Sequence, residues 1–227
     1  MRDSLVDKTY VVRNKGVYFF VYSVPQMIAA NIGMTLPRGG AARVYHQSII
    51  YSDGDGRVET ITSGPAEGRS WYKQIGLTPI CVQIAHLSHP DQSKVLPSFD
   101  TTAWRSARIQ QFFYKSNWNS GDFERARILA DLHRPRIAGV GYNLGGRNSN
   151  SIIAFLWRRL ARVPGSYSCE KLDDPEVALA SFFRPGSDLG LFDYGPRTYL
   201  KVTANWFALG YFAIWSLLDI GTRTIRK

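Results

Sequence analysis

Two β-rich runs on either side of Asp53-Gly54-Asp55-Gly56 constrain the fold of this chain most strongly. The runs cover residues 43–51 and 57–62 and contain many β-branched and aromatic residues, which favour strands. An Asp-Gly pair between such runs is a strong signal for a tight hairpin. The sequence therefore predicts an antiparallel sheet, with further strand-like runs at 78–87 and within 9–22, where Asn14-Lys15-Gly16 marks a turn.

Helical patterns are also present, and we expect an α+β fold in which an antiparallel sheet that carries His46 packs on helices, including the one that begins near Ser149. The expected helices cover residues 24–34, 99–114, 121–132 and 151–162, and Asp122 is expected to cap the third of them. Residues 163–200 are rich in Pro, Gly, Ser and Asp, so we expect them to loop over the surface.

The C-terminal segment 202–218 carries no charged residue and is bounded by Lys201 and Asp219. It is shorter than the roughly 20 residues that a bilayer span needs, so we expect a buried core helix. An interfacial or membrane-inserting helix is the alternative, because the segment is aromatic and its tail is basic. The predicted organisation is one domain at 1–200, followed by an aromatic, apolar helix at 201–227 that docks on the domain or interacts with a membrane.

The charge balance favours anionic partners, because 28 Lys and Arg residues outnumber 18 Asp and Glu residues and give a net charge of +10. An anionic, membrane-associated or envelope-associated substrate is therefore a hypothesis. The basic residues are scattered, and we expect no nucleic-acid partner. The first residues are charged and lack an apolar core, which predicts no signal peptide. The expected location is the cytoplasm, or outside the cell through a dedicated secretion system, with membrane association as a further option.

The candidate site lies in "YNLGGRNSNSIIAFL", residues 142–156, where Ser149 stands between two asparagines just before an apolar helix. A nucleophile there gains from the positive end of the helix dipole, and first-turn N–H groups can donate to an oxyanion. His46, at the start of a hairpin strand, is the candidate general base. The same residues also make a good N-cap, a role open to Ser149, Asn150 and Ser151, and Ser151 is the second-choice nucleophile.

This segment resembles the "Y-x-L-x-x-x-N-C-N-x-F" segment of the PPPDE (DeSI-type) group of permuted papain-like thiol peptidases. The stretch "YHQSIIY" at 45–51 resembles their "H-x-x-I" strand. More broadly, the order of elements is similar to that of the circularly permuted NlpC/P60 and LRAT-like superfamily. The resemblance covers these two short stretches, and Ile152 stands where the pattern has Phe. It implies a papain-like fold with His46 at the position of the catalytic histidine and Ser149 at that of the catalytic cysteine.

Papain-like sites often contain a third polar group that orients the histidine. The neighbouring strand offers Glu59, Thr60, Thr62 and Ser63. The register of the two strands decides which of them faces His46, because a one-residue change of register reverses every side chain. We favour Glu59 or Thr62. Ser48 shares the face of His46 and Gln47 points the other way. The candidate substrate-binding residues are Tyr45, Tyr142, Asn148, Asn150 and Ser151.

Ser149 stands where the family pattern has its catalytic cysteine, and this difference leaves three interpretations of the chain open. A thiol with a pKa of about 8.5 is readily deprotonated by a neighbouring histidine, whereas a serine hydroxyl must lose its proton during attack. The chain is a natural serine variant that keeps hydrolytic chemistry, a cysteine enzyme in which serine was introduced, or an inactive fold that binds another molecule.

The predicted function is a hydrolase or acyltransferase acting on an amide or acyl bond, with His46 as base and Ser149 as nucleophile. The resemblance implies peptide, cell-wall or lipid substrates, and a secreted effector or toxin is a hypothesis by analogy. The alternative is an inactive papain-like fold that acts as a binding or membrane-interacting protein. No cofactor is expected. No metal site is expected either, because the His86-x-x-His89 pattern lacks further ligands.

Overall fold

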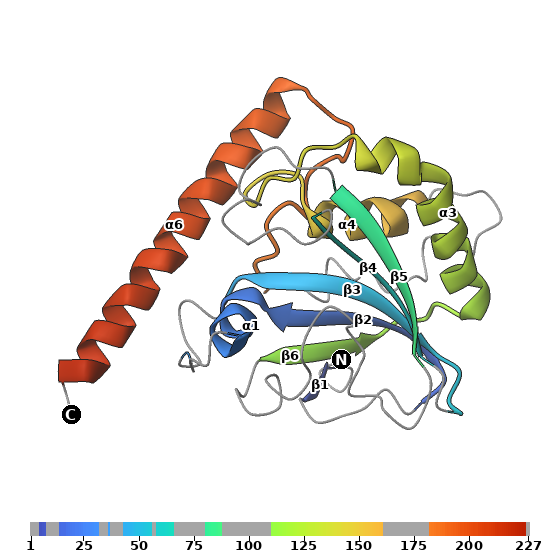
Figure 1. The fold of residues 1–227 in the computed structure, drawn as a ribbon, viewed down its shortest axis with the longest axis horizontal. Coiled ribbons are helices and arrows are strands. Elements are labelled where there is room, and N and C mark those ends of the chain that lie inside the picture. The colour runs from blue at the N-terminus through green and yellow to red at the C-terminus, as the bar shows by residue number, and fades with distance from the viewer. Residues whose placement is uncertain are drawn as a thin grey trace.

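The computed structural model describes residues 5–7, 14–31, 36, 43–55, 58–65, 80–87, 110–160 and 182–225. Its centre is a six-stranded antiparallel sheet with the strand order β1-β6-β2-β3-β4-β5 (Figure 1). The strands are β1 (Leu5–Asp7), β2 (Gly16–Ser23), β3 (Tyr45–Ser52), β4 (Val58–Pro65), β5 (Ile80–Leu87) and β6 (Gln111–Lys115). The helices are α1 (Val24–Asn31), α3 (Ser120–Ala138), α4 (Ser149–Leu160) and α6 (Pro196–Ile225). The chain is therefore α+β, as predicted.

The hairpin predicted around the Asp-Gly turn is confirmed as β3 and β4. Ile49 lies opposite Ile61 in an antiparallel register, and Gly54 in the turn has a φ of 87°, a conformation that glycine adopts without strain. The N–H of Asp55 donates to Oδ1 of Asp53 at 2.8 Å, which closes the turn with a side-chain acceptor.

The main hydrophobic core lies between the sheet and helices α3 and α4. Side chains of β2, β3 and β4 alternate onto this face and meet the apolar side of both helices. Complete burial of one such large side chain contributes about 1.5–3 kcal/mol, so the core holds α4 firmly against the sheet. Its fully buried members include Val17, Phe19, Ile49, Ile61, Phe123, Ile137, Ile152, Ile153 and Leu156.

The predicted helix at 99–114 is wrong at its described end, because Gln111–Lys115 forms strand β6 between β1 and β2. Phe113 lies opposite Phe20 of β2, and the two rings stack with centroids 4.6 Å apart. The next residue, Tyr114, turns to the opposite face and joins the main core. Strand pairing with these aromatic residues therefore overrides the helical spacing. Residues 99–109 lie outside the described residues.

The two helices after β6 are present, but their boundaries differ from the prediction. Helix α3 is capped by Asn119, whose side chain accepts the N–H of Asp122, while the Asp122 carboxylate accepts the N–H of Asn119. Asp122 is therefore the second member of a capping box and not the cap itself. Helix α4 begins at Ser149, two residues earlier than expected.

Residues 182–195 form a loop, as predicted for this region, but the loop is partly buried because it packs against the N-terminal end of α4; residues 163–181 lie outside the described residues. Phe183 forms a parallel bridge with Val44, and its carbonyl accepts the N–H of Tyr45 at 2.9 Å. Arg158 of α4 donates to the carbonyl of Ser187 at 2.6 Å. The carbonyls of Phe183 and Ser187 are therefore satisfied by groups of the domain.

Helix α6 corrects the expectation of a buried core helix at 202–218. It begins at Pro196, and the side of the helix that carries Phe207 and Ile214 is exposed. The opposite side packs on the domain through Phe212, whose ring lies 5.3 Å from that of Phe183. Within the described part of the chain, no helix has the length and apolar character needed to cross a bilayer.

We predict that Gly186→Ala destabilises the fold by about 2 kcal/mol or more. Gly186 has a φ of +83°, and a Cβ atom there would lie 2.3 Å from the carbonyl oxygen of Gly146, so strain and overlap add. Gly210→Ala is the control, because a Cβ at this helical position meets nothing within 4 Å. Urea denaturation should show no loss for the control. Equal stability of the two variants would contradict the packing described for Gly186.

Candidate active site

The site is built where β3 and β4 separate. The ladder between them pairs Ile49–Ser52 with Val58–Ile61. Beyond it, β3 continues to Tyr45 alongside β2, and β4 continues to Pro65 alongside β5. The N-terminal end of α4 lies at this separation, because it hydrogen-bonds to both strands.

Asn150 takes the place of a strand partner along the part of β3 that is not paired with β4. Its Oδ1 accepts the N–H of Gln47 at 2.9 Å, and its Nδ2 donates to the carbonyl of Tyr45 at 2.9 Å. A carboxamide supplies one acceptor and two donors, so it can satisfy both backbone groups at once. The Gln47 side chain in turn donates to the Asn150 carbonyl at 3.0 Å and accepts from Arg184. On the β4 side, Ser63 donates to the carbonyl of Ser149 at 3.0 Å.

Asn148 is the N-cap of α4. Its Oδ1 accepts the N–H of Asn150 at 2.9 Å, and its Nδ2 donates to the carbonyls of Leu144 and Pro185, both at 2.9 Å. Ser151 completes a reciprocal cap, since its hydroxyl accepts the N–H of Asn148 at 3.2 Å and donates to the carbonyl of Gly186 at 2.7 Å. The asparagines and Ser151 therefore use their polar groups to hold the helix end, which leaves the Ser149 hydroxyl for another partner.

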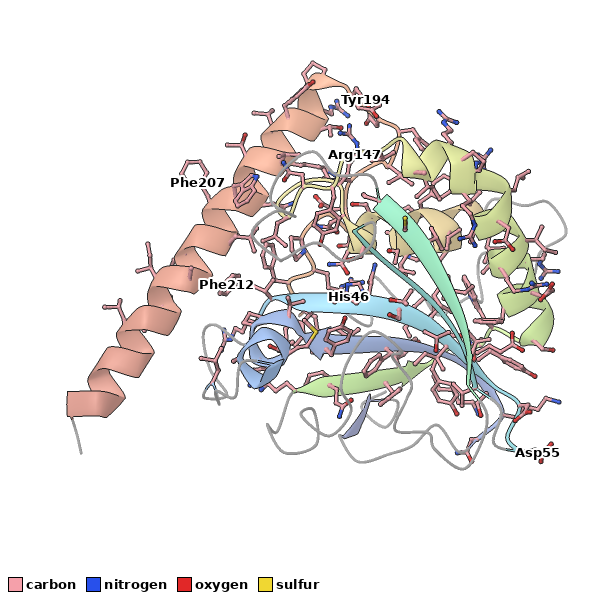
Figure 2. All side chains as sticks on the ribbon, in the orientation of Figure 1. His46, Asp55, Arg147, Tyr194, Phe207 and Phe212 are labelled. Atoms are coloured by element: carbon pink, nitrogen blue, oxygen red, sulfur yellow. The ribbon has the colours of Figure 1, made fainter. Side chains whose placement is uncertain are left out.

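That partner is His46, as the order of elements predicted. Ser149 Oγ lies 2.7 Å from Nδ1 of His46, and Nε2 on the other side of the ring lies 3.2 Å from Oγ1 of Thr62. Thr62 Oγ1 also accepts from the hydroxyl of Ser48 at 2.9 Å. The structure thus brings together a hydroxyl, an imidazole and two further hydroxyls in one hydrogen-bonded chain. Figure 2 shows where His46 lies on the sheet, near the start of β3.

Thr62, and not Glu59, is the residue beside His46. Glu59 lies opposite Tyr51 in the β3–β4 register, towards the turn and away from His46. Positions 59 and 62 differ by three along a strand, so their side chains point to opposite faces. Glu59 is instead within electrostatic range of Arg127 on α3.

The geometry accommodates the tautomer that base catalysis requires. A neutral imidazole has one donor and one acceptor nitrogen. With the proton on Nε2 of His46, that nitrogen donates to Thr62 Oγ1, which has a second lone pair for Ser48. Nδ1 is then free to accept the Ser149 proton. Burial lowers the pKa of His46 from 6.5 to about 4, so the imidazole is neutral at physiological pH.

Two tyrosines enclose the pair. Burial raises the pKa of the Tyr142 phenol, and the side chain of Ser149 lowers that pKa by less. The ring of Tyr22, directly across from His46 in the β2–β3 register, lies 5.0 Å from the imidazole. Tyr45, the other predicted cleft tyrosine, is wrong as a lining residue, because it is buried in the core and hydrogen-bonded to Gln110.

The site is closed in this conformation. Only 5% of Ser149 and 8% of His46 is exposed to solvent. Trp206 of α6 packs on the loop before α4 so tightly that a Cβ at Gly145 would lie 2.7 Å from the indole Cδ1. Substrate access to Ser149 requires some movement of the groups that bury it.

Several contributors could not be found by sequence reasoning. Tyr22 and Trp206 have no motif around them, and their places follow only from strand register and from the packing of α6. The carbonyls of Pro185 and Gly186, which hold the helix end, carry no side-chain signal at all. The glycine at 186 is the one local hint, since a turn that approaches another backbone closely favours glycine.

No described cluster of three His, Cys, Asp or Glu side chains is arranged to hold a metal ion. Cys81 is a free thiol. His89 of the H-x-x-H pattern lies outside the described residues. Comparison with models of known protein families, with curated proteins and with solved structures finds no match for this chain.

We predict that Asn150→Ala destabilises the protein by about 2–4 kcal/mol, because it leaves the N–H of Gln47 and the carbonyl of Tyr45 buried without partners. Asn119→Ala, which removes the cap of α3, should cost only about 1 kcal/mol. Chemical denaturation of the two variants measures both losses. If Asn150→Ala costs no more than Asn119→Ala, the bridging role of Asn150 is wrong.

We also predict that His46 makes stability fall with acidity. The pKa of His46 is about 4 in the folded chain and about 6.5 in the unfolded chain, so between these two pH values the imidazole is protonated in the unfolded chain but not in the folded chain. The contribution of this pKa difference to the free energy of unfolding is fully present above about pH 6.5. It is lost as the pH falls towards 4, which lowers the free energy of unfolding by about 3 kcal/mol in total. The free energy of unfolding of wild type and of His46→Gln, measured from pH 7 to 4, should converge. Parallel curves would contradict the burial of a neutral imidazole.

Proposed function

We propose that this chain is a hydrolase or acyltransferase that attacks an amide or acyl carbonyl with Ser149. The observation that carries the proposal is the 2.7 Å contact between Ser149 Oγ and His46 Nδ1, with Thr62 on the far side of the ring. A nucleophile, a base within hydrogen-bond reach and a third group that orients the base are the arrangement that covalent catalysis requires.

The proposed reaction has two halves. In the first, Nδ1 of His46 accepts the Ser149 proton as Oγ attacks the carbonyl carbon, and the imidazolium then protonates the departing nitrogen or oxygen. This leaves an acyl-serine. In the second, water, or another nucleophile in a transferase, gives a proton to His46 and attacks the acyl carbon, after which the proton returns to Ser149.

Two donors support the negative oxygen that forms during attack. The N–H of Asn150 is already used by Asn148, but among the described residues the N–H of Ser149 forms no hydrogen bond and lies at the positive end of α4. We assign the role of second donor to the phenol of Tyr142, whose pKa the side chain of Ser149 influences. Preorganised donors of this kind are worth several kcal/mol to a transition state.

The resemblance to permuted papain-like proteins supports this proposal, because His46 and Ser149 occupy the positions of that family's histidine and cysteine. We therefore propose a papain-like arrangement of the sheet and α4. Peptide, cell-wall and lipid substrates all remain compatible, as does an anionic or envelope-associated substrate. A role as a secreted effector or toxin is part of the same proposal by analogy.

A specific observation favours the alternative, an inactive fold that binds another molecule. Ser149 stands where the resembling family has cysteine, and the described residue that orients His46 is the neutral Thr62. Among the described residues, no carboxylate is hydrogen-bonded to the ring to stabilise the imidazolium formed during attack. The near-complete burial of both side chains points in the same direction. This alternative predicts a folded protein in which Ser149 does not react.

Labelling with a fluorophosphonate, which phosphonylates activated serines, distinguishes the proposed enzyme from the inactive fold. We expect a single adduct on Ser149, located by mass spectrometry, whose rate of formation falls by at least about 100-fold in His46→Ala, because general-base assistance contributes that much. Ser116→Ala is the matched control, since that buried serine bonds to Val17 within the fold and should leave labelling unchanged.

A folded wild-type protein that forms no adduct at Ser149 would support the inactive fold. Labelling at Ser149 that is unaffected by His46→Ala would contradict the assigned base. Circular dichroism of each variant establishes that a loss of labelling is not a loss of folding.

A further inference from the structure

Helix α6 carries an apolar stripe on the side that faces away from the domain. The stripe, called here the outer stripe, consists of five exposed residues at helical spacing: Leu200, Phe207, Tyr211, Ile214 and Leu218. Phe207 alone exposes 77% of its surface. Monomeric proteins rarely expose a continuous apolar surface of this kind without using it for binding.

The outer stripe is not needed to hold α6 on the domain. Packing is provided by the opposite side of the helix, where Asn205 is buried and Phe212 contacts Phe183. Figure 2 shows Phe207 and Phe212 on opposite sides of α6, with Phe212 turned towards the sheet. The helix therefore presents two apolar faces, of which the domain uses one.

The C-terminal half of α6 is apolar on more than one side. Figure 1 shows this half extending clear of every labelled element. Ala213, Ile214 and Trp215 are consecutive and all exposed, so they span about 200° of the helix circumference, more than half of one turn. A helix that is apolar all round is normally surrounded by protein or lipid.

We propose that the outer stripe of α6 docks on an anionic lipid bilayer surface. Aromatic side chains suit the boundary between headgroups and acyl chains, and Tyr211 and Trp215 lie on or beside the stripe. Basic residues lie at both ends of the apolar stretch, and Asp219 is the single acidic residue of the helix and its tail. The basic residues are Arg197 and Lys201 before it and Arg223, Arg226 and Lys227 after it.

Charge complementarity therefore selects anionic headgroups, which attract such residues by about 1 kcal/mol each near the surface. Lys201 also pairs with Asp188 at 3.5 Å, an exposed contact of little strength. The apolar stripe supplies the buried area, and the flanking cations supply the preference for negative lipid.

A second copy of the helix fits the stripe less well. Two-stranded coiled coils place charged residues beside the apolar seam to set partner and register. Here no charged residue lies between Lys201 and Asp219, and Trp215 stands beside the stripe instead. The docking proposal does not rest on catalysis, since no residue of the outer stripe touches Ser149 or His46 in the described contacts.

Vesicle flotation of the full chain tests the proposal. We expect it to float with vesicles of equal parts phosphatidylglycerol and phosphatidylcholine, and at least about tenfold less with pure phosphatidylcholine. The double substitution Phe207→Ser and Ile214→Ser should reduce binding to the anionic vesicles at least about tenfold. Ser149→Ala should bind as the wild type does, which separates membrane docking from catalysis.

The matched control is Ile128→Ser with Leu132→Ser, two exposed apolar residues on α3, and it should bind normally. Unchanged binding of the stripe variant, or no flotation of the wild type, overturns the proposal. So does a wild-type dimer that this variant dissociates, because the stripe is then occupied by a second copy. Thermal unfolding of both variants at the wild-type temperature shows that the substitutions leave the fold intact.

Discussion

The carboxamide of Asn150 is the interaction on which the site depends. Where β3 leaves β4, the N–H of Gln47 and the carbonyl of Tyr45 need partners, and one side chain of α4 supplies both. These two backbone groups are thus satisfied where the sheet opens, and the end of a helix lies at the opening. The hydrogen bonds of Asn150 to β3 also position Ser149, the residue before it, so that its hydroxyl lies next to His46. The two asparagines flank the serine for this structural reason.

Burial then sets the electrostatics of the pair. Among the described residues, the contacts of the His46 ring are with the hydroxyls of Ser149 and Thr62 and with the ring of Tyr22, and desolvation by burial keeps its pKa low and its ring neutral. A neutral imidazole can accept the proton of Ser149, but a neutral Thr62 gives the resulting cation little support. The same surroundings that prepare the base therefore limit its strength, and this balance determines whether the site is catalytic or only structural. The packing of Trp206 on Gly145 places α6 next to the loop that leads into α4.

The sequence predicted the features that local chemistry determines. The hairpin followed from the Asp-Gly turn, and the meeting of His46 with Ser149 followed from element order and a short motif. The choice between Glu59 and Thr62 could not be made, because it depends on a register that only the folded sheet defines. The helical spacing at 99–114 predicts a helix, but Gln111–Lys115 forms strand β6. Its aromatic residues gain from pairing with β2, a long-range contact that local sequence does not reveal. The exposure of α6 was missed for the same reason, since apolar composition does not say which surface covers it.

The most direct test of the central claim is the nitrogen NMR spectrum of the His46 imidazole, assigned by comparison with His46→Gln. The account predicts a neutral ring from pH 8 to about pH 5, with the proton on Nε2, and an Nδ1 resonance that shifts when Ser149 is replaced by alanine. A ring that titrates near pH 6.5 and is indifferent to Ser149→Ala would contradict it, because His46 would then be solvated and have no contact with the hydroxyl.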